Sequence, residues 1–305
     1  MLKTIYLSIF LLLSLNLFSQ SKSEDTSSNA EYDELKAIVD KDKSIKYQTG
    51  LVNLSDEVEL NIPKGYKFMQ KQDAEYVVYE FWGNPKSIDV LGLIVNENFS
   101  LLNSNNWSFV VSYDNSGYVK DEDADKIDYN EMMNEIHESE VEENKERKKE
   151  GFPSIHIIGW AAKPYYDKST NVLHWAKSIK FGSIEDTTLN YDVRILGRKG
   201  LLSLNAVGTI DQLSDIQSHI PEIVKIAKFK EGNKYSDFNP SIDKVAAYTI
   251  GGLVAGKLLA KAGILALLLK NIKLVLLGTV ALFAALKNKI SNLFGNKSND
   301  DNTVS

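Results

Sequence analysis

Alternation of apolar and polar residues dominates the middle of the chain and predicts an antiparallel sheet. The segment VLHWAKSIKF, residues 172–181, has the period of two expected of a half-buried strand, with Lys177 on the otherwise apolar face. SIHIIGWAAKPYY precedes it across the turn DKSTN, and TLNYDVRIL leads through GRKG into LLSLNAV. Two consecutive hairpins of this kind predict an antiparallel sheet.

Three other segments have the apolar spacing of helices. DYNEMMNEIHESEVEENKERKKEG carries acids in its first half and bases in its last, and Gly151 is a normal helix stop. QLSDIQSHIPEIVKIAKF is amphipathic at helical spacing, and Pro221 either kinks it or starts a second helix. DAEYVVYEFW is a shorter helical stretch that Gly83 and Pro85 would end. Helices beside an antiparallel sheet predict an α+β layered fold.

The first residues have the pattern of a secretory signal. Lys3 is followed by the apolar run IYLSIFLLLSLNLF and then by polar residues, so cleavage is expected near Ser19. An uncleaved anchor is the alternative, although the run is short for a membrane span. The polar stretch from residue 20 to residue 46 is interpreted as a linker with at most a short helix.

A second apolar stretch near the C-terminus predicts a membrane helix whose limits are set by lysines. Leu274 to Leu286 makes about 20 Å of helix, whereas a bilayer core needs roughly 20 residues. A span from about Leu268 places Lys270 and Lys273 in its first two turns, where they can reach the headgroups. Lys287 then anchors the other end.

The segment before this span, IDKVAAYTIGGLVAGKLLAKAG, is also apolar and is predicted to be helical. Gly252, Gly256 and Ala260 recur every fourth residue, so they could pack closely in a dimer or in a helical hairpin. The alternative is a surface helix with Lys257 and Lys261 on one polar stripe.

Composition narrows the function classes. The 305 residues are 43% hydrophobic and 25% charged, as in an ordinary globular protein, and the net charge of -6 gives no reason to expect nucleic acid binding. Cysteine is absent, which excludes disulfides, zinc-thiolate sites and a cysteine nucleophile.

The segment KDEDADKID resembles the start of a calcium-binding loop. Asp121, Asp123 and Asp125 alternate as such ligands do, but Lys126 replaces the required glycine and Met132 the required glutamate. These acids are therefore expected to cap and charge the long helix that follows them, with a weak cation site as the alternative.

No catalytic motif is present. The four histidines lie on separate predicted elements, and neither HExxH nor GxSxG occurs, so no catalytic residue and no cofactor is assigned. Trp82, Trp107 and Trp160 could together form a recognition surface, because aromatic residues dominate interface hot spots, or they could simply be core residues.

Several long motifs resemble one bacterial family. They are WSFVVSYDNSGYVKDEDADKIDY, ENKERKKEGFPSIHIIGWAAKPYYD, LHWAKSIKFG, LNYDVRILGRKGLLSLNAVG and YSDFNPSIDKVAAYTIGGLVAGK. The chain is similar to the domain of unknown function 2167, a family of uncharacterised membrane-anchored proteins. This resemblance implies an exported domain tethered by a C-terminal membrane segment, but it brings no activity or catalytic residue. The order of hairpins and helix also resembles the Mog1/PsbP type of layered fold, a likeness that carries no function.

Together these patterns predict a protein of the bacterial cell envelope, with its main domain exported from the cytoplasm. The expected function is a binding or assembly module that contacts the lipid bilayer and an unidentified envelope protein, as a monomer or as a homo-oligomer. An envelope hydrolase using acidic residues and a histidine is one alternative, and an accessory part of a transport complex is another. The expected divisions are a signal peptide (residues 1–19), a polar linker (20–46), an exported α+β domain (47–240), a membrane-anchoring region of one or two helices (241–290) and a polar tail (291–305).

Overall fold

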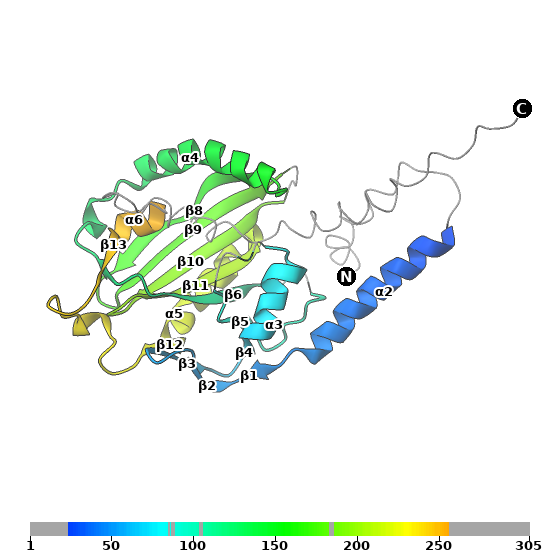
Figure 1. Ribbon diagram of the computed structural model, residues 1–305, viewed down its shortest axis with the longest axis horizontal. Coiled ribbons are helices and arrows are strands. Elements are labelled where there is room, and N and C mark those ends of the chain that lie inside the picture. The colour runs from blue at the N-terminus through cyan, green and yellow to red at the C-terminus, as the bar shows by residue number, and fades with distance from the viewer. Residues whose placement is uncertain (1–23, 85, 87–88, 104–105, 183–185, 256–305) are drawn as a thin grey trace, which may run out of the picture.

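The computed structural model describes residues 24–84, 86, 89–103, 106–182 and 186–255 (Figure 1). The signal sequence, the predicted membrane span and most of the predicted packing stripe fall outside these residues, and so do Lys270, Lys273, Lys287, Gly256 and Ala260. Among the helices of the described part, none is long and apolar enough to cross a membrane.

The centre of the fold is an eight-stranded antiparallel sheet. Its order is β1-β4-β5-β6-β11-β10-β9-β8, and each neighbouring pair is antiparallel. In that order the strands are Tyr47–Gln48, Tyr66–Gln70, Gly92–Asn96, Ser108–Asp114, Leu201–Thr209, Thr188–Leu196, Val172–Phe181 and Ile155–Asp167. Both predicted hairpins, β8 with β9 and β10 with β11, are confirmed.

Two smaller sheets and several helices pack on this sheet. One small sheet is three-stranded, with the order β12-β3-β2, and the other pairs β13 with β7 in parallel. Their strands are Ala227–Phe229, Val58–Ile62, Gly50–Asn53, Val245–Thr249 and Tyr118–Lys120. The helices are α2 Glu24–Ser44, α3 Lys71–Glu75, α4 Tyr129–Lys149, α5 Leu213–Ile226 and α6 Ile250–Ala255. Short turns of other helix types are η1 Tyr76–Phe81, η2 Ala124–Lys126, η3 Ile210–Gln212 and η4 Tyr235–Asp237. The predicted α+β class is therefore confirmed.

Helix α4 begins at a cap that the sequence analysis did not identify. The side chain of Asp128 accepts hydrogen bonds from the backbone N–H groups of Asn130 and Glu131, at 2.8 and 3.1 Å. The predicted end is confirmed, because Gly151 follows the helix with a φ of 82°. The expectation that Asp121 to Asp125 cap this helix is wrong, since the adjacent Asp128 does so.

Helix α4 also closes the free edge of the large sheet. Asn144 accepts from the N–H of Ile155 and donates to its carbonyl, both at 2.7 Å, as a neighbouring strand would. At Ile157, the N–H donates to Glu140 at 3.1 Å, and a ring nitrogen of His137 lies 2.8 Å from the carbonyl. These contacts satisfy backbone N–H and C=O groups in the first part of β8. Without them, this exposed strand edge could pair with a strand of another chain.

Three local predictions differ from the structure. The presumed linker contains α2, a full 21-residue helix rather than a short one, because its Ala, Glu, Leu and Lys residues favour helix even without an apolar face. Residues 245–249 form strand β13 rather than helix, since their backbone pairs with β7. Helix α5 runs unbroken through Pro221 but ends at Ile226, and the AKF of its predicted end becomes β12.

The two faces of the large sheet are covered differently (Figure 1). On one face, α5 and the three-stranded sheet enclose a continuous apolar core that includes Phe109, Leu204 and Ile223. On the other face, α4 and α6 cover one hydrophobic cluster at the β8 and β9 side, and α3 covers a second at the β5 side. Between these two clusters runs a row of polar side chains, here called the polar floor, which consists of Lys177, Asn190, Asp192, Arg194, Ser203 and Asn205.

Candidate functional site

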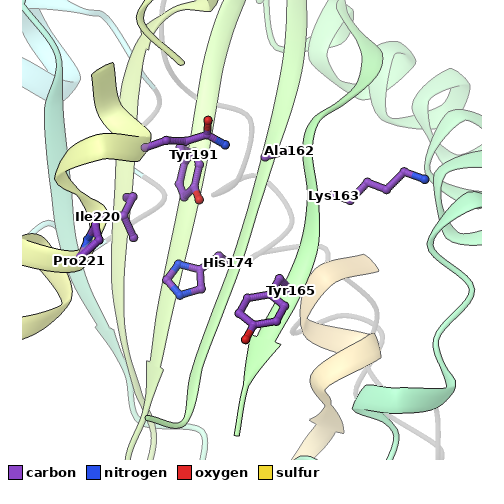
Figure 2. Close-up of a pocket in the computed structure, with 8 residues that line it drawn as sticks. Ala162, Lys163, Tyr165, His174, Tyr191, Ile220 and Pro221 are labelled. Atoms are coloured by element: carbon purple, nitrogen blue, oxygen red, sulfur yellow. The ribbon is translucent and has the colours of Figure 1, made fainter. Parts of the chain in front are cut away.

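A groove lies between α5 and the strands β8, β9 and β10, on the apolar face of the sheet. Its volume is about 340 Å³. The strands contribute Ala162, Lys163, Tyr165, His174 and Tyr191, and the helix contributes Gln217, Ile220 and Pro221. In Figure 2 the rings of Tyr165 and His174 lie side by side on neighbouring strands, and Lys163 points away from them.

Irregular pairing of β8 shapes the strand side of this groove. The register between β8 and β9 shifts between Trp160 and Ala162, and again between Ala162 and Tyr165. Such bulges bend a strand and redirect its side chains. Pro164 lies within the second shift, in the edge strand, where the absence of its N–H is tolerated. As a result Tyr165 stands opposite His174 with its side chain 64% exposed.

His174 is one of the polar residues that line the groove. Burial lowers the pKa of His174, an effect that Asp167 opposes, so the ring is neutral near pH 7. Its Nδ1 atom is buried and has no hydrogen-bond partner among the described residues. The rings of Tyr165 and His174 stack with their centroids 6.4 Å apart and their planes at 18°. Next to them, burial raises the pKa of Tyr191.

This arrangement offers both apolar contact area and hydrogen-bonding groups. Tyrosine rings and the aliphatic parts of α5 offer apolar contact area, and one neutral imidazole can exchange a hydrogen bond with a ligand. In the described ranges, no group of three or more His, Asp or Glu side chains is placed to hold a metal ion.

The three aspartates once compared with a calcium loop point to different partners. Asp121 accepts from the hydroxyl of Tyr166 at 2.9 Å, and Asp125 forms an ion pair with Lys168. Asp123 accepts from the hydroxyl of Thr249 at 2.5 Å and from the N–H of Gly251 at 3.0 Å. Asp123 therefore holds the start of α6, which is a structural role.

The three candidate tryptophans do not form one recognition surface, because each packs in a different hydrophobic cluster. Trp107 belongs to the core under α5, Trp160 packs against the cluster under α4, and Trp82 packs against the cluster under α3. The indole N–H groups of Trp107 and Trp160 are also used, by Asp215 at 2.5 Å and by the carbonyl of Tyr129 at 2.9 Å.

The sequence analysis missed both the groove and the polar floor. The sequence analysis gave His174 no role, whereas the structure places it in the groove, on the sheet face that α5 covers. Asp192 and Arg194 alternate with apolar residues as exposed positions of a strand would, but all nine residues of β10 are buried. Lys177 was the one available signal, because it interrupts an otherwise apolar strand face.

Comparison with known families identifies the chain. The model for the protein family of unknown function DUF2167 matches residues 46–284, and the chain belongs to this family. A comparison with curated protein sequences finds no match.

Two solved structures align with most of the domain at low similarity. Cyanobacterial PsbP (CyanoP) from Synechocystis aligns with a TM-score of 0.34 and 9% identity, over 61% of this chain and 92% of that one. LpqN, involved in cell envelope biogenesis of Mycobacterium tuberculosis, aligns with a TM-score of 0.28 and 14% identity, over 63% and 96%. At such low TM-scores neither likeness carries fold or function to this chain, so the PsbP-like layering stays a prediction.

Proposed function

We propose that this member of the DUF2167 family is a binding module of the bacterial cell envelope, exported and held at the cytoplasmic membrane by its C-terminal segment. The secretory pattern of residues 1–19 and the apolar stretch before Lys287 support this location. The module's task is to engage a protein partner through its folded domain.

The observation that carries the binding role is the groove beside α5. It is open to solvent, much of its wall is aromatic and aliphatic, and one of its polar residues, His174, has a buried nitrogen with no partner among the described residues. Tyr165 lies on its rim, and tyrosine, with an apolar ring and a polar hydroxyl, is a common anchor residue of protein interfaces. A segment that inserts an apolar side chain beside Ile220 and gives His174 a hydrogen bond would satisfy this surface.

Site-specific photocrosslinking tests the binding role on the full chain in membranes. A photoreactive phenylalanine analogue at Tyr165 is expected to form an adduct with one other envelope protein. The same analogue at Val141, which is 64% exposed on α4, serves as the matched control and is expected to form none. Substitution of Ala162 by Arg should abolish co-purification of that protein from detergent extracts, and Val141→Arg should not. Recovery of the bait alone from both positions would refute the proposal.

Cysteine labelling tests the location, because the chain contains no cysteine. Ser139→Cys, on the exposed side of α4, should react with a membrane-impermeant maleimide in intact cells whose outer layer has been made permeable. Ser298→Cys, which lies beyond the described residues, should react only after lysis if one helix spans the membrane. Equal labelling of both positions in intact cells would contradict a single span.

A further inference from the structure

The polar floor places charged groups where a protein interior rarely keeps them. Lys177 is 5% exposed, Arg194 is 8% exposed and Asp192 is fully buried. All three lie on the same face of the large sheet, on the adjacent strands β9 and β10, and β9 is next to the edge strand β8. Buried charges are costly unless they are paired and hydrogen-bonded, so each polar atom here needs a partner.

Hydrogen bonds within the polar floor satisfy only some of these buried polar atoms. Arg194 Nη2 donates to Asp192 Oδ1 at 2.6 Å, and Asn205 Nδ2 donates to the same oxygen at 3.0 Å. The guanidinium of Arg194 also lies 5.3 Å from the centre of the Trp175 ring. Asp192 thus uses one oxygen twice and leaves the other buried without a partner among the described residues.

The unsatisfied atoms are mainly donors. Arg194 Nη1, Asn190 Nδ2 and Trp175 Nε1 are buried and lack an acceptor in the described part of the chain. They are close neighbours, because Asp192 stands opposite Trp175 and Asn190 stands opposite Lys177 in the β9–β10 register. Three free donors and the adjacent ammonium group therefore outnumber the one free acceptor.

No nearby carboxylate in the described part of the chain accepts a hydrogen bond from Arg194 Nη1, Asn190 Nδ2 or Trp175 Nε1. Asp114 on β6 accepts from the hydroxyl of Tyr248 at 2.5 Å with Oδ2 and from the N–H of Ser116 at 2.9 Å with Oδ1. Glu143 on α4 has a pKa raised by burial, and it interacts electrostatically with the Lys177 ammonium group.

We propose that the polar floor is a binding site for a small carboxylate. A carboxylate brings two oxygens with about four acceptor positions and no donor, which matches the surplus at Arg194, Asn190 and Trp175 beside Lys177. The ligand is small because the side chains that would hold it are more than nine-tenths buried. This site is on the opposite face of the sheet from the groove beside α5 and stands independently of the proposed protein-binding role.

Indole N–H signals provide a test that needs no disruptive substitution. The chain has four tryptophans, so full-length protein in detergent labelled with ¹⁵N-tryptophan gives four indole signals, which single Trp→Phe variants assign. Sodium acetate, titrated against sodium chloride at constant ionic strength, should shift the Trp175 signal in a saturable way. The Trp107 signal should stay in place, because Trp107 lies in the core under α5 and its N–H group already has an acceptor. No shift at Trp175 up to the highest acetate concentration would overturn the proposal, as expected if ordered water fills the floor.

Thermal unfolding of matched variants tests the residues involved. Acetate should raise the Tm of the wild-type chain relative to chloride, and this rise should disappear in Lys177→Met and in Arg194→Met. Lys180→Met is the control, because Lys180 is an exposed lysine of the same strand, and it should keep the rise. If Lys177→Met keeps the full rise, or if phosphate shifts the Trp175 signal and acetate does not, the assignment to a carboxylate is wrong.

Discussion

The two faces of the large sheet are built from the same strands but differ in what they bury. Toward α5, strand β10 presents Leu189, Tyr191, Val193 and Ile195 to a continuous apolar core. Toward α4, the same strand presents Asn190, Asp192 and Arg194, which separate two hydrophobic clusters. A core made only for stability would be apolar on both faces, because a buried ion pair rarely stabilises more than the apolar residues that could replace it. Both faces therefore contribute hydrophobic core, and the polar floor is the part of the interior that the proposed carboxylate site would explain.

The largest expected effect comes from leaving the buried cations unpaired. Asp192→Ala removes the carboxylate that Arg194 and Asn205 bind, so it should lower the free energy of unfolding by about 3–5 kcal/mol. Urea denaturation of the full chain in detergent measures this loss. Asp125→Ala removes an exposed partner of Lys168 and should change stability by less than about 1 kcal/mol. Equal losses in the two variants would show that the floor carries no buried charge.

On the apolar face, two substitutions of different size at one buried residue should change the free energy of unfolding through packing alone. Ile223 on α5 is completely buried, so Ile223→Ala should cost about 2–5 kcal/mol and Ile223→Val about 0.5–1.5 kcal/mol. The same urea titration applies, and neither change should alter the response of the Trp175 indole signal to acetate. A change in that response would mean that the two faces are not independent.

A smaller effect is expected where Asp123 holds the start of α6. Asp123→Ala removes the acceptor for Thr249 and Gly251 and should cost about 0.5–2 kcal/mol, the range for a lost helix cap. Amide hydrogen exchange should show the loss first in residues 245–255. If exchange rises instead in the first turn of α4, then Asp123 rather than Asp128 caps that helix.

The smallest effect concerns the pH dependence of the groove. Because burial lowers the pKa of His174 in the folded chain, the unfolded chain binds more protons between the folded and unfolded pKa values. The contribution of His174 is fully present above the unfolded pKa of about 6.5 and is lost as the pH falls below it. His174→Gln should therefore flatten the fall in unfolding free energy as the pH drops below about 6.5. A slope identical to that of the wild type would place His174 in contact with water.

Regular periodicity made part of this fold predictable from sequence. The two hairpins and helix α4 follow from alternation and helical spacing that extend over nine residues or more. Strand β13 was not predictable in this way. The mostly apolar segment VAAYT is compatible with a helix as well as with a strand, and its parallel partner β7 lies far away in sequence. Gly117, with φ of 121° and no room for a side chain beside Lys244, permits that approach, but its role is visible only in the fold.

Both candidate sites depend on which faces become covered. The pattern of β10 identifies two faces but cannot show that each is buried, since a polar face usually meets water. The groove likewise needs the register shifts of β8 beside α5, which no local spacing encodes. Lys177, on an apolar strand face, is the residue from which the polar floor could have been suspected.

The most direct test of this account is the stability of a chain whose polar floor is made apolar. In Lys177→Met/Asp192→Leu/Arg194→Met the buried charges are removed together, so no ion is left without its partner. If the floor is kept for binding at a cost in stability, urea denaturation should show an unfolding free energy equal to the wild type or up to about 1–4 kcal/mol higher, with the acetate response lost. A free energy several kcal/mol lower than that of the wild type would show instead that the polar floor is part of what holds the fold together.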